Sequence, residues 1–255
     1  MRANETGPRQ LRMIDRLRLA AQRLDGKRPV RPNTAKLLRE ASYLVSPFTR
    51  RLRRAPGISR ADNRQIVLIL PGFIATPRTM RYLARQIEQA GHKAKRWNLG
   101  FNKGPSPERL QILERHLLDI HQRYGQKPVL LGWSLGGLFA RELAHRQPHV
   151  VAKVITMGSP FSGDPRSNNA WRLYQFVTGH KVDEPPLELE LTAKPPVETV
   201  ALWSPRDGVI APRSARGRPG ERDRAAALRC THMGFSYSPD AVEAVLRELN
   251  TPLLR

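Results

Sequence analysis

The feature that most constrains this chain is a serine flanked by glycines where a strand pattern meets a helix pattern. The motif Gly-Trp-Ser-Leu-Gly occupies residues 132–136, after the apolar run 128–131 and before a helix-forming stretch. A strand-to-helix turn of this kind is sharp and strained, and it exposes the serine hydroxyl at the end of the sheet. Gly132 and Gly136 are needed because a Cβ at either position would collide with the neighbouring strand or helix. The motif predicts that Ser134 is a nucleophile; the alternative is a serine that only caps the helix.

A second apolar run, residues 66–70, has the pattern of a buried strand and ends in Pro-Gly-Phe-Ile at residues 71–74. A serine that attacks a carbonyl group needs N–H donors for the oxyanion that forms. We predict that these donors are the backbone N–H groups of Leu135 and Phe73, since Gly72 lets the loop approach the serine turn. The alternative is an ordinary Pro-Gly turn.

A third strand pattern, residues 197–203, is followed by Asp207 and Gly208. An acid just past the end of a strand is well placed to orient a histidine. We prefer Asp207 because none of the other acidic candidates closes a strand; these are Asp164, Asp183, Glu184 and Asp223. The alternative is that Asp-Gly only forms a turn.

The histidine of the site is predicted from its order in the chain. Of the seven histidines, His232 alone follows both Ser134 and Asp207 within a loop, and a helix pattern begins after it near Pro239. The order Ser, Asp, His is one of three orders known for this set of residues. Cys230 lies two residues before His232, and we interpret it as a packed thiol because the serine already occupies the strained turn.

Strand and helix patterns alternate after residue 61, which predicts an α/β fold with a doubly wound, mainly parallel sheet of about six strands. The expected strands are 66–70, 94–97, 128–133, 152–157, 197–203 and 225–230, and the clearest helices are 77–90, 107–124 and 239–249. The alternation stops between residues 161 and 196, where we predict a helical insertion that acts as a lid.

The substrate pocket is predicted to be apolar. The insertion carries three aromatic residues, Trp171, Tyr174 and Phe176, and the two predicted loops of the site add Trp133 and Ile74. A helix buried on the body of the protein is the alternative for the insertion.

The chain resembles the α/β-hydrolase superfamily, and within it the bacterial lipase and esterase branch. The resemblance is carried by residues 132–137 and by Val-Ile-Thr-Met-Gly-Ser-Pro at residues 154–160, and it covers about residues 64–250. It implies a serine ester hydrolase that needs no metal and no organic cofactor. One departure is Pro71-Gly72, where lipases commonly carry His-Gly, which affects side-chain hydrogen bonding in the loop only. Two alternative functions are an acyltransferase that forms the same acyl-enzyme and a non-catalytic, surface-binding member of the fold.

The N-terminal segment is unusually basic. The chain has a formal net charge of +22, and residues 1–60 hold 16 Lys and Arg against four Asp and Glu. We therefore divide the chain into a basic, partly helical extension, 1–60, and a catalytic domain, 61–255, and we expect the extension to be separate from the catalytic residues. Five apolar residues fall on one helical face, namely Leu11, Ile14, Leu17, Ala21 and Leu24, with Arg12, Arg16 and Arg23 opposite.

This basic helix has two possible surroundings. Its apolar stripe can pack on the hydrolase body with the arginines in water, which we favour, or it can lie on an anionic membrane. Nucleic acid is disfavoured as a partner because aromatic residues make up 6% of the chain and no recognition motif is present. No apolar run has the length of a membrane span or the pattern of a signal peptide, so we expect a cytoplasmic protein that can be peripheral to the membrane. The pattern leaves the oligomeric state open.

Overall fold

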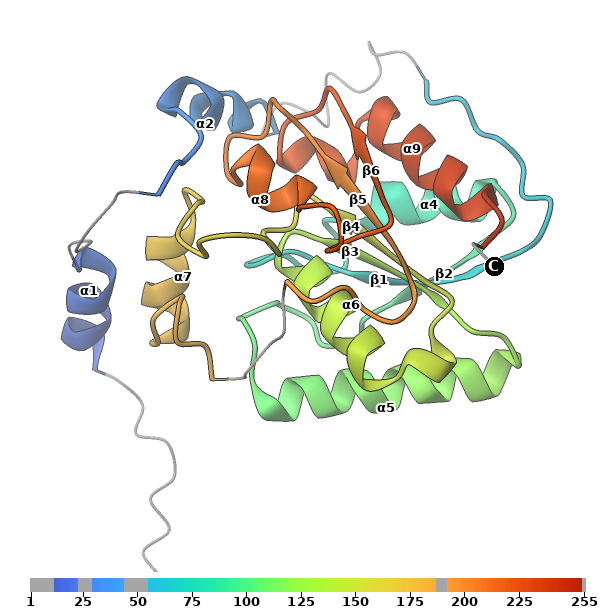
Figure 1. Ribbon diagram of the computed structural model, residues 1–255, viewed down its shortest axis with the longest axis horizontal. Helices are drawn as coiled ribbons and strands as arrows, with labels where there is room; N and C mark the ends of the chain where they lie inside the picture. Colours follow the sequence, from blue (N-terminus) through green and yellow to red (C-terminus); the bar gives the residue numbers. More distant parts are fainter. Residues whose placement is uncertain (1–11, 23–28, 44–54, 187–191, 254–255) are drawn as a thin grey trace, which may run out of the picture.

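The computed structural model describes residues 12–22, 29–43, 55–186 and 192–253. Within these residues six strands form one parallel sheet in the order β2-β1-β3-β4-β5-β6 (Figure 1). The strands are β1 (Ile66–Leu70), β2 (Lys93–Arg96), β3 (Val129–Trp133), β4 (Lys153–Met157), β5 (Glu198–Trp203) and β6 (Arg224–Ala227). Every neighbouring pair is parallel, which confirms the predicted fold class.

The burial of each strand matches its central or edge position in the sheet. All residues of β1, β3 and β4 are buried, as expected for strands covered by helices on both faces. The edge strands β2 and β6 are shorter and partly exposed, and β2 carries three basic residues. Charged side chains on short edge strands discourage pairing with other chains.

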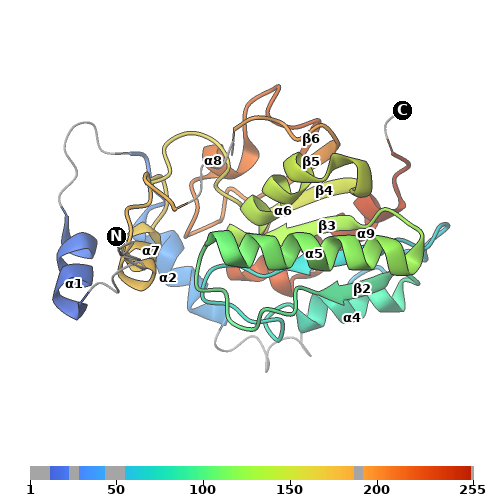
Figure 2. The ribbon, with the colours of Figure 1, turned by 90° about the horizontal axis from the view of Figure 1, so that it is seen from below.

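Helices cover both faces of the sheet, as Figures 1 and 2 show. On one face lie α4 (Arg81–Gln89) and α9 (Pro239–Asn250), which pack on Val67 and Ile69; on the other lie α5 (Pro107–Tyr124) and α6 (Leu135–Arg146), which pack on Leu68. Alternate residues of one strand therefore serve two cores, because successive side chains point to opposite faces.

Shorter helices occupy the connections. They are α7 (Trp171–Thr178), α8 (Pro212–Arg216) and the 3₁₀ turns η2 (Pro148–Val150) and η3 (Met233–Ser236). Helix α8 lies in an arginine-rich stretch, but it packs on β5 and buries its two small residues, Ser214 and Ala215.

The N-terminal segment forms α1 (Met13–Ala21), which lies beside α7, and α2 (Thr34–Glu40), which lies near the loops that follow the sheet (Figure 1). We favoured packing of this segment on the protein, and α1 does contact α7, but the prediction that its apolar stripe makes the contact is wrong. Arg16 donates hydrogen bonds to the carbonyl oxygens of Phe176 and Val177, whereas Ile14 and Leu17 remain 55% and 54% exposed. The side of α1 that carries Arg16 faces the protein, because the C-terminal carbonyls of α7 attract a guanidinium group.

No helix among the described residues combines the length and the apolar character that a membrane crossing requires.

Candidate active site

The site lies where the order of the strands reverses. The chain passes from β1 outward to β2 and then returns to β3 on the other side of β1. In open α/β sheets the crevice outside the carboxyl ends of such strands is the usual ligand site. The loops that follow β1 and β3 meet there, and a Cβ added to Gly72 would lie 3.1 Å from Trp133 Cε3 and 3.2 Å from Ser134 Cβ. Glycine at position 72 thus permits the close approach predicted from the sequence.

Ser134 occupies the strained turn between β3 and α6. Its φ of 54° and ψ of −123° fall in a region that non-glycine residues rarely adopt, and its N–H donates to the carbonyl oxygen of Met157 at 2.8 Å. A Cβ at Gly132 would strike the backbone of Gly136, and one at Gly136 would strike Leu70. The serine holds the N-cap position of α6 but makes no capping hydrogen bond with its side chain, so helix capping does not explain its presence.

The two predicted oxyanion donors border the same space. Leu135 is the first residue of α6, and the first N–H groups of a helix have no acceptor within the helix. Phe73 lies in the loop after β1, with its ring 5.4 Å from that of Tyr174. Both residues line the pocket that contains Ser134. Their role as donors to an oxyanion stays a prediction.

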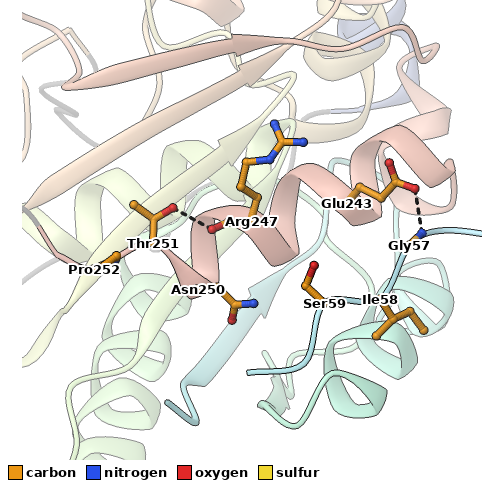
Figure 3. A pocket seen from close by; sticks show the side chains of 8 residues that line it. All are labelled: Gly57, Ile58, Ser59, Glu243, Arg247, Asn250, Thr251 and Pro252. Atoms are coloured by element: carbon orange, nitrogen blue, oxygen red, sulfur yellow. Dashed lines mark hydrogen bonds between the residues drawn. The ribbon is translucent and has the colours of Figure 1, made fainter. Parts of the chain in front are cut away.

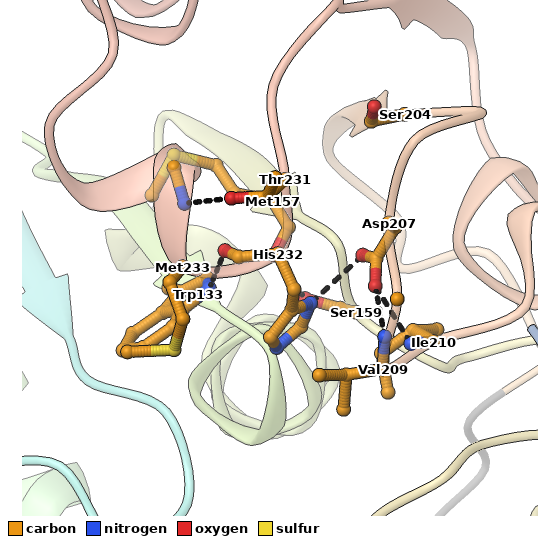
Figure 4. A network of polar contacts seen from close by, with 12 residues as sticks. Trp133, Met157, Ser159, Ser204, Asp207, Val209, Ile210, Thr231, His232 and Met233 are labelled. Carbon is orange, nitrogen blue, oxygen red and sulfur yellow. Dashed lines mark hydrogen bonds and ion pairs between the residues drawn. The ribbon is translucent and has the colours of Figure 1, made fainter. Parts of the chain in front are cut away.

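The structure brings Asp207 and His232 together. His232 Nδ1 lies 2.8 Å from Asp207 Oδ2, and both side chains are almost completely buried (Figure 4). Asp207 Oδ1 accepts hydrogen bonds from the N–H groups of Val209 and Ile210, at 2.8 and 2.7 Å. The carboxylate is therefore fixed by the loop that carries it, and its second oxygen is directed at the imidazole.

The electrostatics of this pair favour a basic imidazole. Burial lowers the pKa of His232, but the negative charges of Asp207 and Glu40 and the hydrogen bond to Asp207 outweigh burial. The pKa of His232 therefore lies above its ordinary value. A group with a raised pKa takes up a proton more readily, as a general base must.

The rival acids and the rival nucleophile have other surroundings. Each of the four acids that we set aside forms an ion pair: Asp164 and Asp183 with Arg166, Glu184 with Lys181, and Asp223 with Lys194. The thiol of Cys230 is buried, and burial raises its pKa, which leaves it in the unreactive thiol form.

Trp133 has a different place from the predicted one. Its side chain is buried in the core, and its indole N–H donates to the carbonyl oxygen of His232 at 3.1 Å (Figure 4). It therefore holds the histidine loop and does not line the pocket. The position of Trp133 next to Ser134 predicts that it is near the site, but not that its N–H finds a backbone acceptor 99 residues away.

Glu40 is the functional-site residue that the sequence analysis missed. Its carboxylate accepts hydrogen bonds from three backbone N–H groups, those of Gly208, His232 and Met233, at 2.9, 2.8 and 2.9 Å. The expectation that the N-terminal extension is separate from the predicted catalytic residues is therefore wrong. Nothing local in the sequence points to Glu40, because all three donors lie at least 168 residues further along the chain.

A pocket of about 90 Å³ opens beside Ser134 and is lined mainly by apolar side chains. It includes Trp171 and Tyr174 as predicted, but Ile74 and Phe176 are not among its lining residues. The φ of 58° at Ile74 accompanies a side chain that is 36% exposed, and the backbone of Phe176 faces α1. The remaining lining residues include Phe73, Pro105, Leu135, Leu138, Pro160, Pro165, Asn168, Ala170, Val182, Pro185 and Ile210.

A wider hollow of about 690 Å³ lies between residues 57–59 and α9 (Figure 3). Glu243 accepts a hydrogen bond from the N–H of Gly57 there, at 2.8 Å. The hollow includes none of the predicted site residues. Across the described residues no group of three or more His, Cys, Asp or Glu side chains has a geometry that could hold a metal ion.

The fold and the strained serine turn define a parallel α/β protein of the hydrolase type. A model of the alpha/beta hydrolase fold matches residues 55–182, which is half of the chain, and the protein belongs to this family.

The relatives match over short segments. The chain is 37% identical to a pimeloyl-[acyl-carrier protein] methyl ester esterase of Aromatoleum aromaticum over 67 residues, which are 26% of this chain and 27% of the relative. It is 28% identical to the biotin biosynthesis bifunctional protein BioHC of Teredinibacter turnerae over 117 residues, 44% of this chain and 20% of that protein. The chain thus spans about a quarter or less of the curated relatives it matches.

Among solved structures, a monoacylglycerol lipase of Paleococcus ferrophilus is similar, with a TM-score of 0.52 and 16% identity. The match covers 78% of this chain and 98% of that one. At this identity the similarity shows the fold alone.

Proposed function

We propose that the protein is a serine hydrolase of carboxylic esters, with Ser134 as nucleophile, His232 as general base and Asp207 as its partner. The observation that carries the proposal is the buried Asp207–His232 hydrogen bond of 2.8 Å at the same end of the sheet as the strained Ser134. Membership of the alpha/beta hydrolase family supports it.

In the proposed reaction, His232 takes the proton from the Ser134 hydroxyl as the serine oxygen attacks the carbonyl carbon. Asp207 holds the proton of the imidazole on Nδ1, so that Nε2 is free to accept. The N–H groups of Phe73 and Leu135 stabilise the oxyanion. His232 then gives its proton to the departing alcohol, and water, activated by the same histidine, releases the acid and restores the serine.

The pocket indicates the class of ester. Its lining is apolar, and its volume of about 90 Å³ suits a short uncharged group better than a long chain. The name of the Aromatoleum aromaticum relative describes a methyl ester esterase, which also supports an ester with a small alcohol group. We therefore propose esters with a short group on the side that enters the pocket.

An acyltransferase that uses the same acyl-enzyme is the alternative within this chemistry. A competing alcohol added to the assay separates the two, because a transferase converts the acyl group into a new ester. A non-catalytic, surface-binding protein is the alternative outside it, and it predicts no turnover of any ester.

The experiment is hydrolysis of p-nitrophenyl esters of increasing chain length by the full chain. Ser134→Ala and His232→Ala are each expected to lower kcat by at least about 10⁴-fold, because members of a triad act as a unit. Ser59→Ala, an exposed serine in the hollow of Figure 3, is the matched control and should keep full activity. Esterase activity that survives in Ser134→Ala would show that another residue is the nucleophile.

A further inference from the structure

We infer that Glu40, from the N-terminal helix α2, is a positioning residue of the active site that joins the Asp207 loop to the His232 loop and places a second negative charge beside the imidazole. This inference rests on the proposed function, in which His232 is the base. It assigns a role in the reaction to a segment that precedes the catalytic fold in the chain.

The geometry of the carboxylate is the first support. Oε1 accepts from Gly208 N–H and His232 N–H, and Oε2 accepts from Met233 N–H. The carboxylate of Glu40 thus holds the backbone N–H of Gly208, the residue after Asp207, and the backbone N–H of His232. Because hydrogen bonds to a charged acceptor are short and strong, the two loops are tied to a common point.

The opposite side of the histidine backbone is held as well. The carbonyl oxygen of His232 accepts from the indole of Trp133, the residue before Ser134. Glu40 therefore completes a clamp in which the backbone N–H of His232 is tied to the Asp207 loop and its carbonyl oxygen to the serine turn. A displacement of about 1 Å between reacting groups can cost 10²-fold in rate, so such a clamp matters for catalysis.

The segment that carries Glu40 is docked closely. A Cβ added to Gly208 would collide with the backbone of Lys36, so only glycine fits where α2 crosses the Asp207 loop. The side-chain amide of Asn169 donates to the carbonyl oxygens of both Pro32 and Gly208, at 3.1 and 2.8 Å. The ring of Tyr43 lies 5.8 Å from that of Tyr237, just after the histidine loop.

The charge of Glu40 gives a second, separable effect. The charged groups that act on His232 are Asp207 and Glu40, and both raise the pKa of the imidazole against the effect of burial. Removal of the Glu40 charge therefore lowers the pKa of His232. Since the base must be neutral to accept a proton, the acid limb of the pH profile of kcat/KM moves to lower pH.

Glu40→Gln isolates these effects because glutamine has the same shape. Its single oxygen can still accept from Gly208 and His232, but its NH₂ group then faces the N–H of Met233, a donor against a donor. The variant loses the charge and one hydrogen bond. Glu40→Ala removes all three acceptors.

The test uses the full chain and p-nitrophenyl butyrate. We expect Glu40→Gln to lower kcat about 10-fold and Glu40→Ala about 10²-fold, with KM changed less than about twofold. The acid limb of kcat/KM and the NMR titration of the His232 ring should both shift to lower pH in Glu40→Gln, with the ring signal assigned through His232→Gln. Glu243→Gln is the matched control: it also replaces a carboxylate that accepts from a backbone N–H, but in the hollow of Figure 3, which contains none of the predicted site residues, and it should change none of these values.

The possible results distinguish a failure of the proposed esterase function from a failure of the role inferred for Glu40. If the wild-type chain hydrolyses no ester, the proposed function fails, yet the His232 titration still tests whether Glu40 acts on the imidazole. An unchanged titration together with wild-type kcat in Glu40→Gln would overturn the inference. A fall in melting temperature without a shift of either pH measurement would also overturn it, because it would show that Glu40 only docks the N-terminal segment.

Discussion

Replacement of Asp207 by asparagine tests the electrostatic core of the site, and the structure predicts how the new amide must lie. Val209 and Ile210 both donate to Asp207 Oδ1, so the amide oxygen has to remain at that position. The NH₂ group then replaces Oδ2, 2.8 Å from His232 Nδ1. A donor at this place forces the imidazole to accept at Nδ1 and to carry its proton on Nε2, where it can no longer take the proton of a serine.

The expected loss of kcat is about 10⁴-fold, the size of the same substitution in a serine protease with this pair, and it corresponds to about 5 kcal/mol of transition-state stabilisation. The assay is the hydrolysis of p-nitrophenyl butyrate, with circular dichroism to verify the fold. Asp164→Asn is the control, since Asp164 also accepts from a backbone N–H in a tight turn, and its ion pair is with Arg166 and not with a histidine. Asp207→Asn activity within 10-fold of wild type would refute the assignment and leave Asp183 or Glu184 to be tested next.

Two further predictions concern stability and partners. Lys153→Met is expected to lower the free energy of unfolding in urea by about 2 kcal/mol, because it removes a buried ammonium that pairs with Glu198 at 3.2 Å and donates to two carbonyl oxygens, while Glu198 keeps its ion pair with Arg224. Lys181→Met, which breaks the exposed pair with Glu184, should cost less than about 1 kcal/mol, and equal losses would contradict the argument from burial. We also propose that the exposed apolar face of α1, with Met13, Ile14 and Leu17, contacts anionic membranes. The full chain should then bind phosphatidylglycerol vesicles at low salt and dissociate from them as the salt concentration rises. The Ile14→Glu variant should bind these vesicles less tightly. Absence of binding, or binding that salt does not weaken, would disprove this proposal.

Local patterns in the sequence predicted the sheet and its main helices well. Helix α5 begins and ends where expected because Ser106 caps its first turn and Gly125 ends it in a left-handed conformation. Apolar runs covered on both faces made the central strands easy to recognise. The pairing of Asp207 with His232 was predicted from the strand end before Asp207 and from the position of His232 later in the chain, and the structure brings the two side chains within 2.8 Å.

The errors arose where the environment of a side chain depends on distant backbone. The amphipathic pattern of α1 predicts a face that packs, but carbonyl groups at the end of α7 favour Arg16 over the apolar stripe. Trp133 looked like a pocket residue because indole is apolar, and its N–H, which decides its orientation, has no signature in the sequence. Glu40 was missed for the same reason: three backbone N–H groups arranged by the tertiary fold create its site.

The contact between Glu40 and His232 also bears on the order in which the parts of the site form during synthesis. The two residues are 192 positions apart, so during synthesis the carboxylate emerges long before the loops that it holds. Contacts of such large sequence separation close a long loop and form late in folding. His232, the proposed base, is therefore secured only once the last strand and the residues after it have joined the sheet, so partly made chains hold the serine turn before His232 is in place.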